Sequence, residues 1–293
     1  MRSSQGHVTR TLATGSVLIL LLATPHGGAQ SQNVSQHHPR NEQSIQGKSL
    51  PRPAKEVQHE ISSVSAPEVR VVYLVPSDVK PRRNFRHSAS DAIQSLQDWY
   101  GVQVGGKTFK LHKPIVEIVR TTHPAKWFRE NQSGDDRTFW FWNNATADGF
   151  AITGGTFDDP RFIWVFYIDA DPDDDQHVGG SNGVALLPLQ DVLGILGRRP
   201  ESVCRWVGGL GHELGHAFGL DHPANCENGK ADRGSPECQS LMFDGYQNYC
   251  GTLLTPEHKA QLDQSPFFSP QEIKADRRSC SNVNVGPRES AHP

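Results

Sequence analysis

Residues 208–223 read GGLGHELGHAFGLDHP, and the interpretation of the whole chain starts from this stretch. An α-helix turns about 100° per residue, so His212 and His216 would lie one turn apart on the same face. Two imidazoles at that spacing can bind one zinc ion. Glu213 would lie about 100° around the helix from His212, where it can reach a metal-bound water without binding the metal itself. The stretch therefore predicts a helix that carries a metal site.

The apolar residues near these histidines gather on the opposite side of the expected helix. They are Val207, Leu210, Leu214, Ala217 and Phe218. One face is thus expected to be buried, and incidental surface histidines would not explain so clean a separation. Gly219 is expected to end the helix, because glycine accepts the left-handed conformation. His222 can then supply a third nitrogen, which leaves the fourth zinc position open for water, as in catalytic sites.

The spacing from His212 to His222 is HExxHxxGxxH, and it resembles the zinc signature of the metzincin metalloproteases. The resemblance implies an α+β fold with an upper mixed β-sheet and its helices, the active-site helix, and a smaller irregular lower subdomain. That subdomain would carry the Met-turn, a tight turn beneath the zinc. The methionine of the turn would be Met242, which is the only methionine besides Met1.

The resemblance also implies an activity, namely a zinc-dependent endopeptidase with one catalytic Zn²⁺ and a protein or peptide substrate. Zinc lowers the pKa of its bound water toward ~7. Glu213 would take the proton as this water attacks the peptide carbonyl, and would pass it to the leaving amine. Two alternatives stay open: a catalytically weak zinc-binding module of the same fold, and a zinc hydrolase that acts on a non-peptide amide.

The resemblance does not extend to a single branch of the family. Pro223, directly after the third histidine, resembles the serralysins, whereas HELGHAFGLDH itself resembles the matrixins. Serralysins and astacins carry a zinc-facing tyrosine two residues after the turn methionine, and here that position is Asp244. Tyr246 is the nearest tyrosine and is the candidate transition-state donor.

Apolar runs predict the strands of the sheet. They lie at residues 69–75, 115–119, 162–168 and 184–187. The third run, FIWVFYI, is apolar throughout, so we expect that strand to be central. The resemblance implies that the strand at residues 183–187 is the sheet edge that binds an extended peptide, through Val184, Ala185 and Leu186.

Two helices are predicted from their starting residues. Ser88 and Asp91 form a capping-box-like start for a helix over residues 89–100. Thr255 caps a short helix over residues 255–262. The segment between about 121 and 160 is expected to be partly helical and packed by aromatic side chains.

The chain is expected to divide into four segments. Residues 17–23, VLILLLA, follow positive charge and precede small residues, which is typical of a signal peptide over residues 1–29. Residues 30–67 are polar and predict a disordered linker or propeptide. Residues 68–266 would form the catalytic domain, and residues 267–293 a C-terminal tail.

The signal peptide predicts a secreted protein, or a periplasmic one in a Gram-negative cell, with no membrane span. The 293 residues carry a net charge of −3, so no bulk charge attracts nucleic acid, and we expect no such partner. We expect a monomer.

Export permits disulfides. Cys226–Cys238 is the preferred pair because its loop is short and lies beside the expected site. Cys204, Cys250 and Cys280 compete for the remaining pairing, and an odd number of cysteines leaves one unpaired.

The acidic run at residues 169–175, DADPDDD, has some features of a Ca²⁺ site. Asp169, Asp171 and Asp173 have the spacing of an EF-hand loop. However, Asp174 replaces the glycine and Gly180 replaces the glutamate that such a loop requires. The run therefore favours a solvated acidic loop over calcium.

Overall fold

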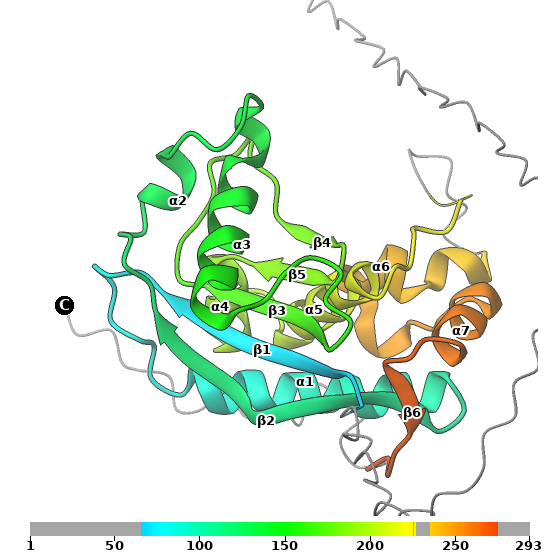
Figure 1. Ribbon diagram of the computed structural model, residues 1–293. Coiled ribbons are helices and arrows are strands. Elements are labelled where there is room, and N and C mark those ends of the chain that lie inside the picture. The colour runs from blue at the N-terminus through cyan, green and yellow to red at the C-terminus, as the bar shows by residue number, and fades with distance from the viewer. Residues whose placement is uncertain (1–65, 225, 227–234, 275–293) are drawn as a thin grey trace, which may run out of the picture. The chain divides into compact units, whose positions relative to one another are not determined.

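A mixed β-sheet forms the frame of the protein in the computed structural model, which describes residues 66–224, 226 and 235–274 (Figure 1). Its strands are β1 (Glu68–Val75), β2 (Lys107–Arg120), β3 (Phe162–Ile168), β4 (Gly179–Ser181), β5 (Val184–Leu187) and β6 (Phe268–Pro270). The predicted signal peptide, residues 30–65 of the predicted linker and residues 275–293 of the predicted tail lie outside the described residues.

Helices follow or separate these strands. The α-helices are α1 (Phe85–Gln103), α2 (Trp127–Glu130), α3 (Trp140–Thr153), α4 (Leu189–Ile195), α5 (Val203–Ala217), α6 (Leu241–Asn248) and α7 (Pro256–Asp263). The 3₁₀ helices are η1 (Arg137–Phe139), η2 (Pro236–Gln239) and η3 (Tyr249–Gly251). None of the described helices combines the length and the apolar composition needed to cross a bilayer.

The strand order is β4-β5-β3-β1-β2-β6. The neighbouring pairs among β1, β2, β3 and β5 are parallel, whereas β4 and β6 pair antiparallel at the two ends of the sheet. This arrangement confirms the predicted α+β fold with a mixed sheet. Strand β3 lies inside the sheet, as its unbroken apolar sequence predicts.

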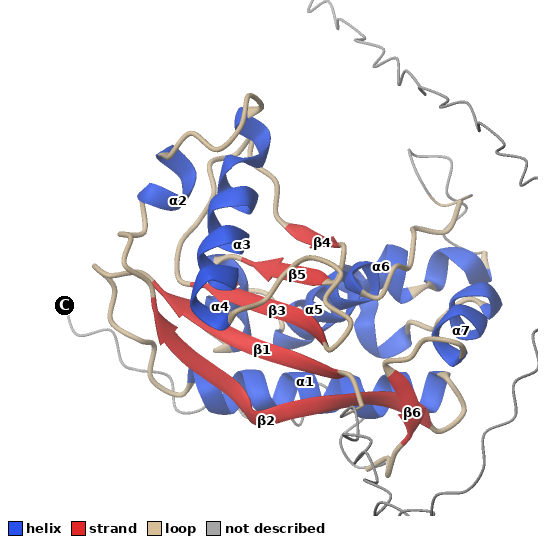
Figure 2. Ribbon diagram, viewed as in Figure 1, coloured by secondary structure: helices blue, strands red, loops and turns tan. Residues whose placement is uncertain are grey.

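The sheet is covered on both faces, because successive side chains of a strand point to opposite sides. On β3, Val165 and Tyr167 pack in the layer that contains α1, α4 and α5, whereas Trp164 and Phe166 pack in the layer of α2 and α3. Figure 2 shows α3 and α1 on opposite sides of the strands. Both layers are needed to bury β3 completely.

Helix α1 begins earlier than the sequence predicts. Its N-terminal flank is Asn84, which has a φ of 66° and makes no side-chain capping bond, while Ser88 is buried inside the helix. The predicted capping box is therefore wrong. The ring of Phe85 lies 4.3 Å from that of Tyr73 and 5.1 Å from that of Tyr167, so packing on the sheet fixes the first turn instead.

The predicted C-terminal tail begins too early. Residues 268–270 form β6, which pairs antiparallel with the start of β2. Phe268 is buried with its ring 5.0 Å from that of Phe218 and 6.1 Å from that of Phe109. A strand of three residues shows no periodicity, so only this packing reveals it.

The acidic run after β3 is held by arginines. The buried Asp169 carboxylate pairs with Arg82 at 2.8 Å and also accepts a hydrogen bond from the Tyr73 hydroxyl. Asp173 and Asp175 both pair with Arg137. Most of the run is exposed or half-buried, as the predicted solvated loop requires, and several of its carboxylates form ion pairs. Among the described residues only the histidine triad forms a group able to hold a metal.

Calcium should leave the stability of the protein unchanged. Asp169 and Asp173 already pair with arginines, and Asp171 accepts the Gln190 backbone N–H. Breaking these contacts offsets what the ion would contribute. Thermal unfolding with and without millimolar CaCl₂, in zinc-loaded protein, measures this. A rise of several degrees in Tm would contradict the assignment of the acidic run to ion pairing.

Candidate active site

Helix α5 carries the predicted metal ligands and ends where the sequence predicts. The Ser202 hydroxyl accepts the backbone N–H of Cys204 at the start of the helix. At its end, the Gly219 N–H donates to the His216 carbonyl and the Leu220 N–H to the Gly215 carbonyl, the bond pattern of a Schellman motif. Gly219 has a φ of +87°, and the reversal brings the following loop back toward the helix.

The three predicted histidines converge. The Nε2 atom of His216 lies 3.1 Å from that of His212 and 3.0 Å from that of His222, and the third separation is 3.2 Å. Tetrahedral zinc with bonds of about 2.0–2.1 Å spaces its nitrogen ligands by roughly 3.3 Å. The triad therefore fits a zinc ion without rearrangement.

Backbone carbonyls fix the tautomer of the His212 and His216 rings. Nδ1 of His212 lies 3.0 Å from the Leu241 carbonyl, and Nδ1 of His216 lies 2.8 Å from the Leu220 carbonyl. A carbonyl only accepts, so each Nδ1 carries the proton and each Nε2 keeps a lone pair for a metal. Burial lowers the pKa of His212 to about 4, which keeps that ring neutral at physiological pH.

Helix α6 lies against the same part of α5. Its first residues supply the Leu241 carbonyl and the fully buried side chain of Met242. The sulfur of Met242 packs directly on Gly215, one residue before His216. The Ser240 hydroxyl accepts the Met242 backbone N–H and so fixes the start of α6. The structure thus places Met242 directly against the helix segment that carries His212 and His216.

Glu213 is held by two donors. The Tyr246 hydroxyl donates to its Oε1 at 2.8 Å, and the Gly180 backbone N–H donates to the same carboxylate. Burial raises the pKa of Glu213 to about 7, although both hydrogen bonds act in the opposite direction. A carboxyl with a pKa near neutrality is suited to take up and release a proton. The structure thus joins Tyr246, the nearest tyrosine after Met242, to Glu213.

The sheet edge differs from the prediction. Val184, Ala185 and Leu186 belong to β5, which is buried because β4 pairs with it on its outer side. The edge next to the site is therefore β4, at Gly179–Ser181.

The two strands are joined by Asn182 and Gly183, with φ values of 49° and 79°. Asn-Gly with both φ positive is the signature of a two-residue hairpin turn. That dipeptide is the sequence signal that could have located β4.

Strand β4 touches helix α5 at Gly180. A Cβ atom at that position would lie 2.0 Å from the Glu213 carbonyl oxygen and 2.8 Å from the Cβ of His216. No side chain fits there, so glycine is required for the edge strand to approach the site this closely.

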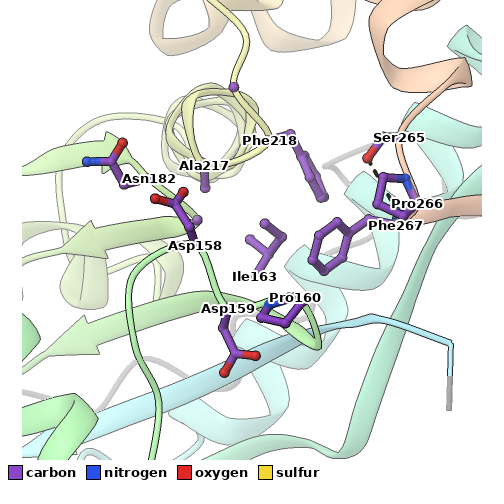
Figure 3. A pocket seen from close by; sticks show the side chains of 12 residues that line it. Asp158, Asp159, Pro160, Ile163, Asn182, Ala217, Phe218, Ser265, Pro266 and Phe267 are labelled. Carbon is purple, nitrogen blue, oxygen red and sulfur yellow. Dashed lines mark hydrogen bonds between the residues drawn. The ribbon is translucent and has the colours of Figure 1, made fainter. Parts of the chain in front are cut away.

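A recess of about 360 Å³ lies beside the end of α5. Its apolar wall is formed by Ile163, Phe218 and Phe267, whose side chains project toward one another, while Asp158 and Asn182 lie at its rim (Figure 3). The Ser265 hydroxyl accepts the Phe267 backbone N–H and fixes that side of the wall. The recess begins one residue after His216, at Ala217.

Near Glu213 lies a cluster of three buried polar side chains, from Asp191, Tyr167 and Arg205. The sequence does not reveal this cluster, because the three residues are far apart in the chain and belong to no motif. Asp191 of α4 is 2% exposed, and burial together with the nearby charge of Glu213 raises its pKa to about 8. Asp191 Oδ1, the Tyr167 hydroxyl and Arg205 Nε are buried without a hydrogen-bond partner among the described residues. Asp191 is therefore expected to be protonated at neutral pH.

The predicted disulfide Cys226–Cys238 is confirmed, with Cα atoms 5.4 Å apart. Cys204, at the start of α5, is also disulfide-bonded, and its partner lies outside the described side chains. The Cys250 side chain and Cys280 are likewise outside them, so the open pairing stays open.

Comparison with known proteins found no matching family model and no matching curated protein. Among solved structures, three crystal structures of OgpA from Akkermansia muciniphila are similar to the chain. Two contain wild-type OgpA, at 22% and 21% identity with TM-scores of 0.47 and 0.46. The third contains catalytic inactive OgpA in complex with an O-glycopeptide (glycodrosocin) substrate, at 20% identity and a TM-score of 0.47.

These matches cover 69% to 70% of this chain and 62% of OgpA, so the chain spans less than two thirds of the length of these neighbours. At these TM-scores the likeness carries no argument about activity.

Removing His222 should lower zinc content. The wild type should hold one equivalent of zinc. A His222→Ala variant keeps only the two histidines of α5, so it should retain much less than one equivalent. Metal analysis after dialysis against a weak chelator measures this, and circular dichroism checks that α5 still forms. Unchanged zinc occupancy would mean that another residue is the third ligand.

Replacing Asp191 should change how stability depends on pH. The raised pKa of the folded state stabilises the fold at low pH, and this contribution declines as the pH rises from 3.8 toward about 8. Asparagine cannot titrate, so Asp191→Asn should gain up to about 1.4 kcal/mol per pH unit over the wild type in this window. Urea unfolding of both proteins in EDTA, at mildly acidic and mildly alkaline pH, measures the difference. A gap that stays constant with pH would contradict a buried, protonated Asp191.

Proposed function

We propose that this chain is a metzincin-type zinc metalloendopeptidase that hydrolyses peptide bonds in protein or peptide substrates. One observation carries the proposal: three Nε2 atoms converge within 3.2 Å of one another beside a carboxylate that is hydrogen-bonded by Tyr246. His212, His216 and His222 would hold zinc. When bound, zinc supplies a Lewis acid that polarises a carbonyl and acidifies water.

Glu213 is the general base and acid in this proposal. In the metal-free site burial raises its pKa to about 7, and zinc in the triad would favour the ionised form, which is the form that takes a proton from the attacking water before delivering it to the leaving amine. Its carboxylate is already oriented by two donors, so little ordering of the side chain is needed before reaction.

Tyr246 has a second role in the proposal. Its hydroxyl donates to Glu213 at 2.8 Å, and the same donor can turn toward a substrate oxygen that gains negative charge. Burial and the negative charge of Glu213 raise the pKa of Tyr246 well above its usual value, so this hydroxyl keeps its proton. It therefore acts as a donor and never as a base.

The substrate would run along β4. An exposed strand edge offers backbone N–H and C=O groups to an extended peptide. Gly180, in the middle of β4, contacts Glu213, so a peptide paired with this strand would place its carbonyl groups beside the catalytic residue. Export of the enzyme is part of the proposal, on the sequence of the predicted signal peptide alone.

The Glu213→Gln variant tests the chemistry. It should keep zinc and the fold and lose nearly all turnover, on the order of 10²-fold or more, because amide cannot accept the proton. Cleavage of a mixed peptide pool, followed by mass spectrometry, compares this variant with the wild type and with chelator-treated wild type.

Full activity of the variant would exclude Glu213 as the base. A wild type that binds zinc but cleaves no peptide would instead favour the non-catalytic zinc-binding module.

A further inference from the structure

Strand β4 dictates where the side chains of a paired peptide would point. Residues paired across neighbouring strands project to the same face of a sheet. Gly180 pairs with Ala185, which packs in the layer of α5, whereas the next residue, Ser181, pairs with Val184 in the layer of α3. A peptide residue opposite Gly180 would face the histidine triad, and its two neighbours would face α3.

The α3 side of β4 holds an aromatic recess of about 490 Å³. Its wall consists of Phe139, Trp142, Phe157, His177 and Val178, and its floor is β4 itself with Asn182. Phe139 is 44% exposed and Phe157 is 41% exposed, which leaves large apolar surface open beside the edge strand. We call this feature the aromatic recess.

The wall of the aromatic recess is fixed to the acidic run. The Gln176 side chain is buried and donates to the Arg129 carbonyl at 2.9 Å, and the His177 backbone N–H donates to the Thr138 carbonyl at 2.7 Å. The Arg137 ion pairs to Asp173 and Asp175 hold the same two segments together. The recess is thus preorganised, and a ligand would not have to order it.

We propose that the aromatic recess is a specificity subsite that binds a bulky apolar side chain of the substrate, within about two residues of the cleaved bond at 3.3 Å per residue. The inference rests on the proposed function, because it needs a peptide paired with β4. Gly179 and Gly180 line the recess and also contact Glu213, so the subsite and the catalytic residue share one strand.

The chemistry of the wall selects the occupant. Phe139 and His177 lie with their rings 4.9 Å apart, and the described residues of the recess carry no charged carboxylate or ammonium group. A buried charge would therefore find no partner there, whereas an aromatic or branched aliphatic side chain would contact Phe139, Trp142 and Phe157. The recess beside α5 differs, because Asp158 lies at its rim.

Two measurements test the aromatic recess, one by turnover and one by binding. Cleavage of a peptide library by zinc-loaded wild type should show one position, close to the cleaved bond, at which Phe, Leu or Met is preferred over Ser or Asp by roughly tenfold or more. Binding of capped alanine pentapeptides with central Phe, Leu, Ser or Asp to zinc-loaded Glu213→Gln protein should show the same order by calorimetry.

Variants of the wall link the preference to the recess. Phe139→Ala and Phe157→Ala remove exposed rings, so neither should endanger folding, and both should reduce the apolar preference in turnover and in binding. Ile152→Ala is the matched control, since Ile152 is an apolar residue of α3 that is 41% exposed and does not line the recess. It should leave both profiles unchanged.

The outcomes separate the subsite from the activity. Cleavage without an apolar preference, or with a preference that Phe139→Ala and Phe157→Ala do not alter, overturns the subsite and leaves the protease intact. Selection of a polar, charged or sugar-bearing residue at that position also overturns it. The Phe pentapeptide could instead bind preferentially, with binding weakened by Phe139→Ala, while the wild type cleaves no peptide. That result supports the subsite and overturns the proposed protease activity.

Discussion

The contact between edge strand β4 and helix α5 at Gly180 is the constraint on which the site depends. Because no side chain separates them, Gly180 packs directly against the Glu213 backbone carbonyl. The Gly180 N–H also donates a hydrogen bond to the Glu213 carboxylate. The same approach places the outer edge of the sheet beside the histidine triad. A larger residue at 180 would separate the edge strand from Glu213, even if all three histidines were retained.

Burial favours the neutral forms of the titratable side chains around the site. His212 loses its tendency to become protonated, while Glu213 and Asp191 lose part of their tendency to become charged. Buried neutral imidazoles are ready to bind a cation, and the charge of such an ion would in turn favour the ionised form of nearby carboxyls. The protonation states of the cluster and the occupancy of the triad are therefore linked.

Much of the architecture could be predicted from the sequence wherever a pattern is long or chemically specific. The apolar runs locate β1, β3 and β5 almost to the residue, and the histidine spacing locates the converging triad. The failures involve short elements fixed by tertiary packing. The start of α1 follows the contacts of Phe85, and the three residues of β4 and of β6 have no visible period. The ion pairs of the acidic run have no sequence signal, because their partners, Arg82 and Arg137, are distant in the chain.

The two ends of the sheet share a property that bears on how the protein behaves at high concentration. Both β4 and β6 are only three residues long, and both run antiparallel to the strand that they cover. A long, bare edge strand would offer a continuous ladder of N–H and C=O groups to a second copy of the chain and so invite aggregation. At its end of the sheet, β4 limits that ladder to a few groups, whereas β6 pairs with only residues 107–109 of the longer β2. At β4, the edge that the proposed substrate would use is thus too short to favour the growth of a larger sheet.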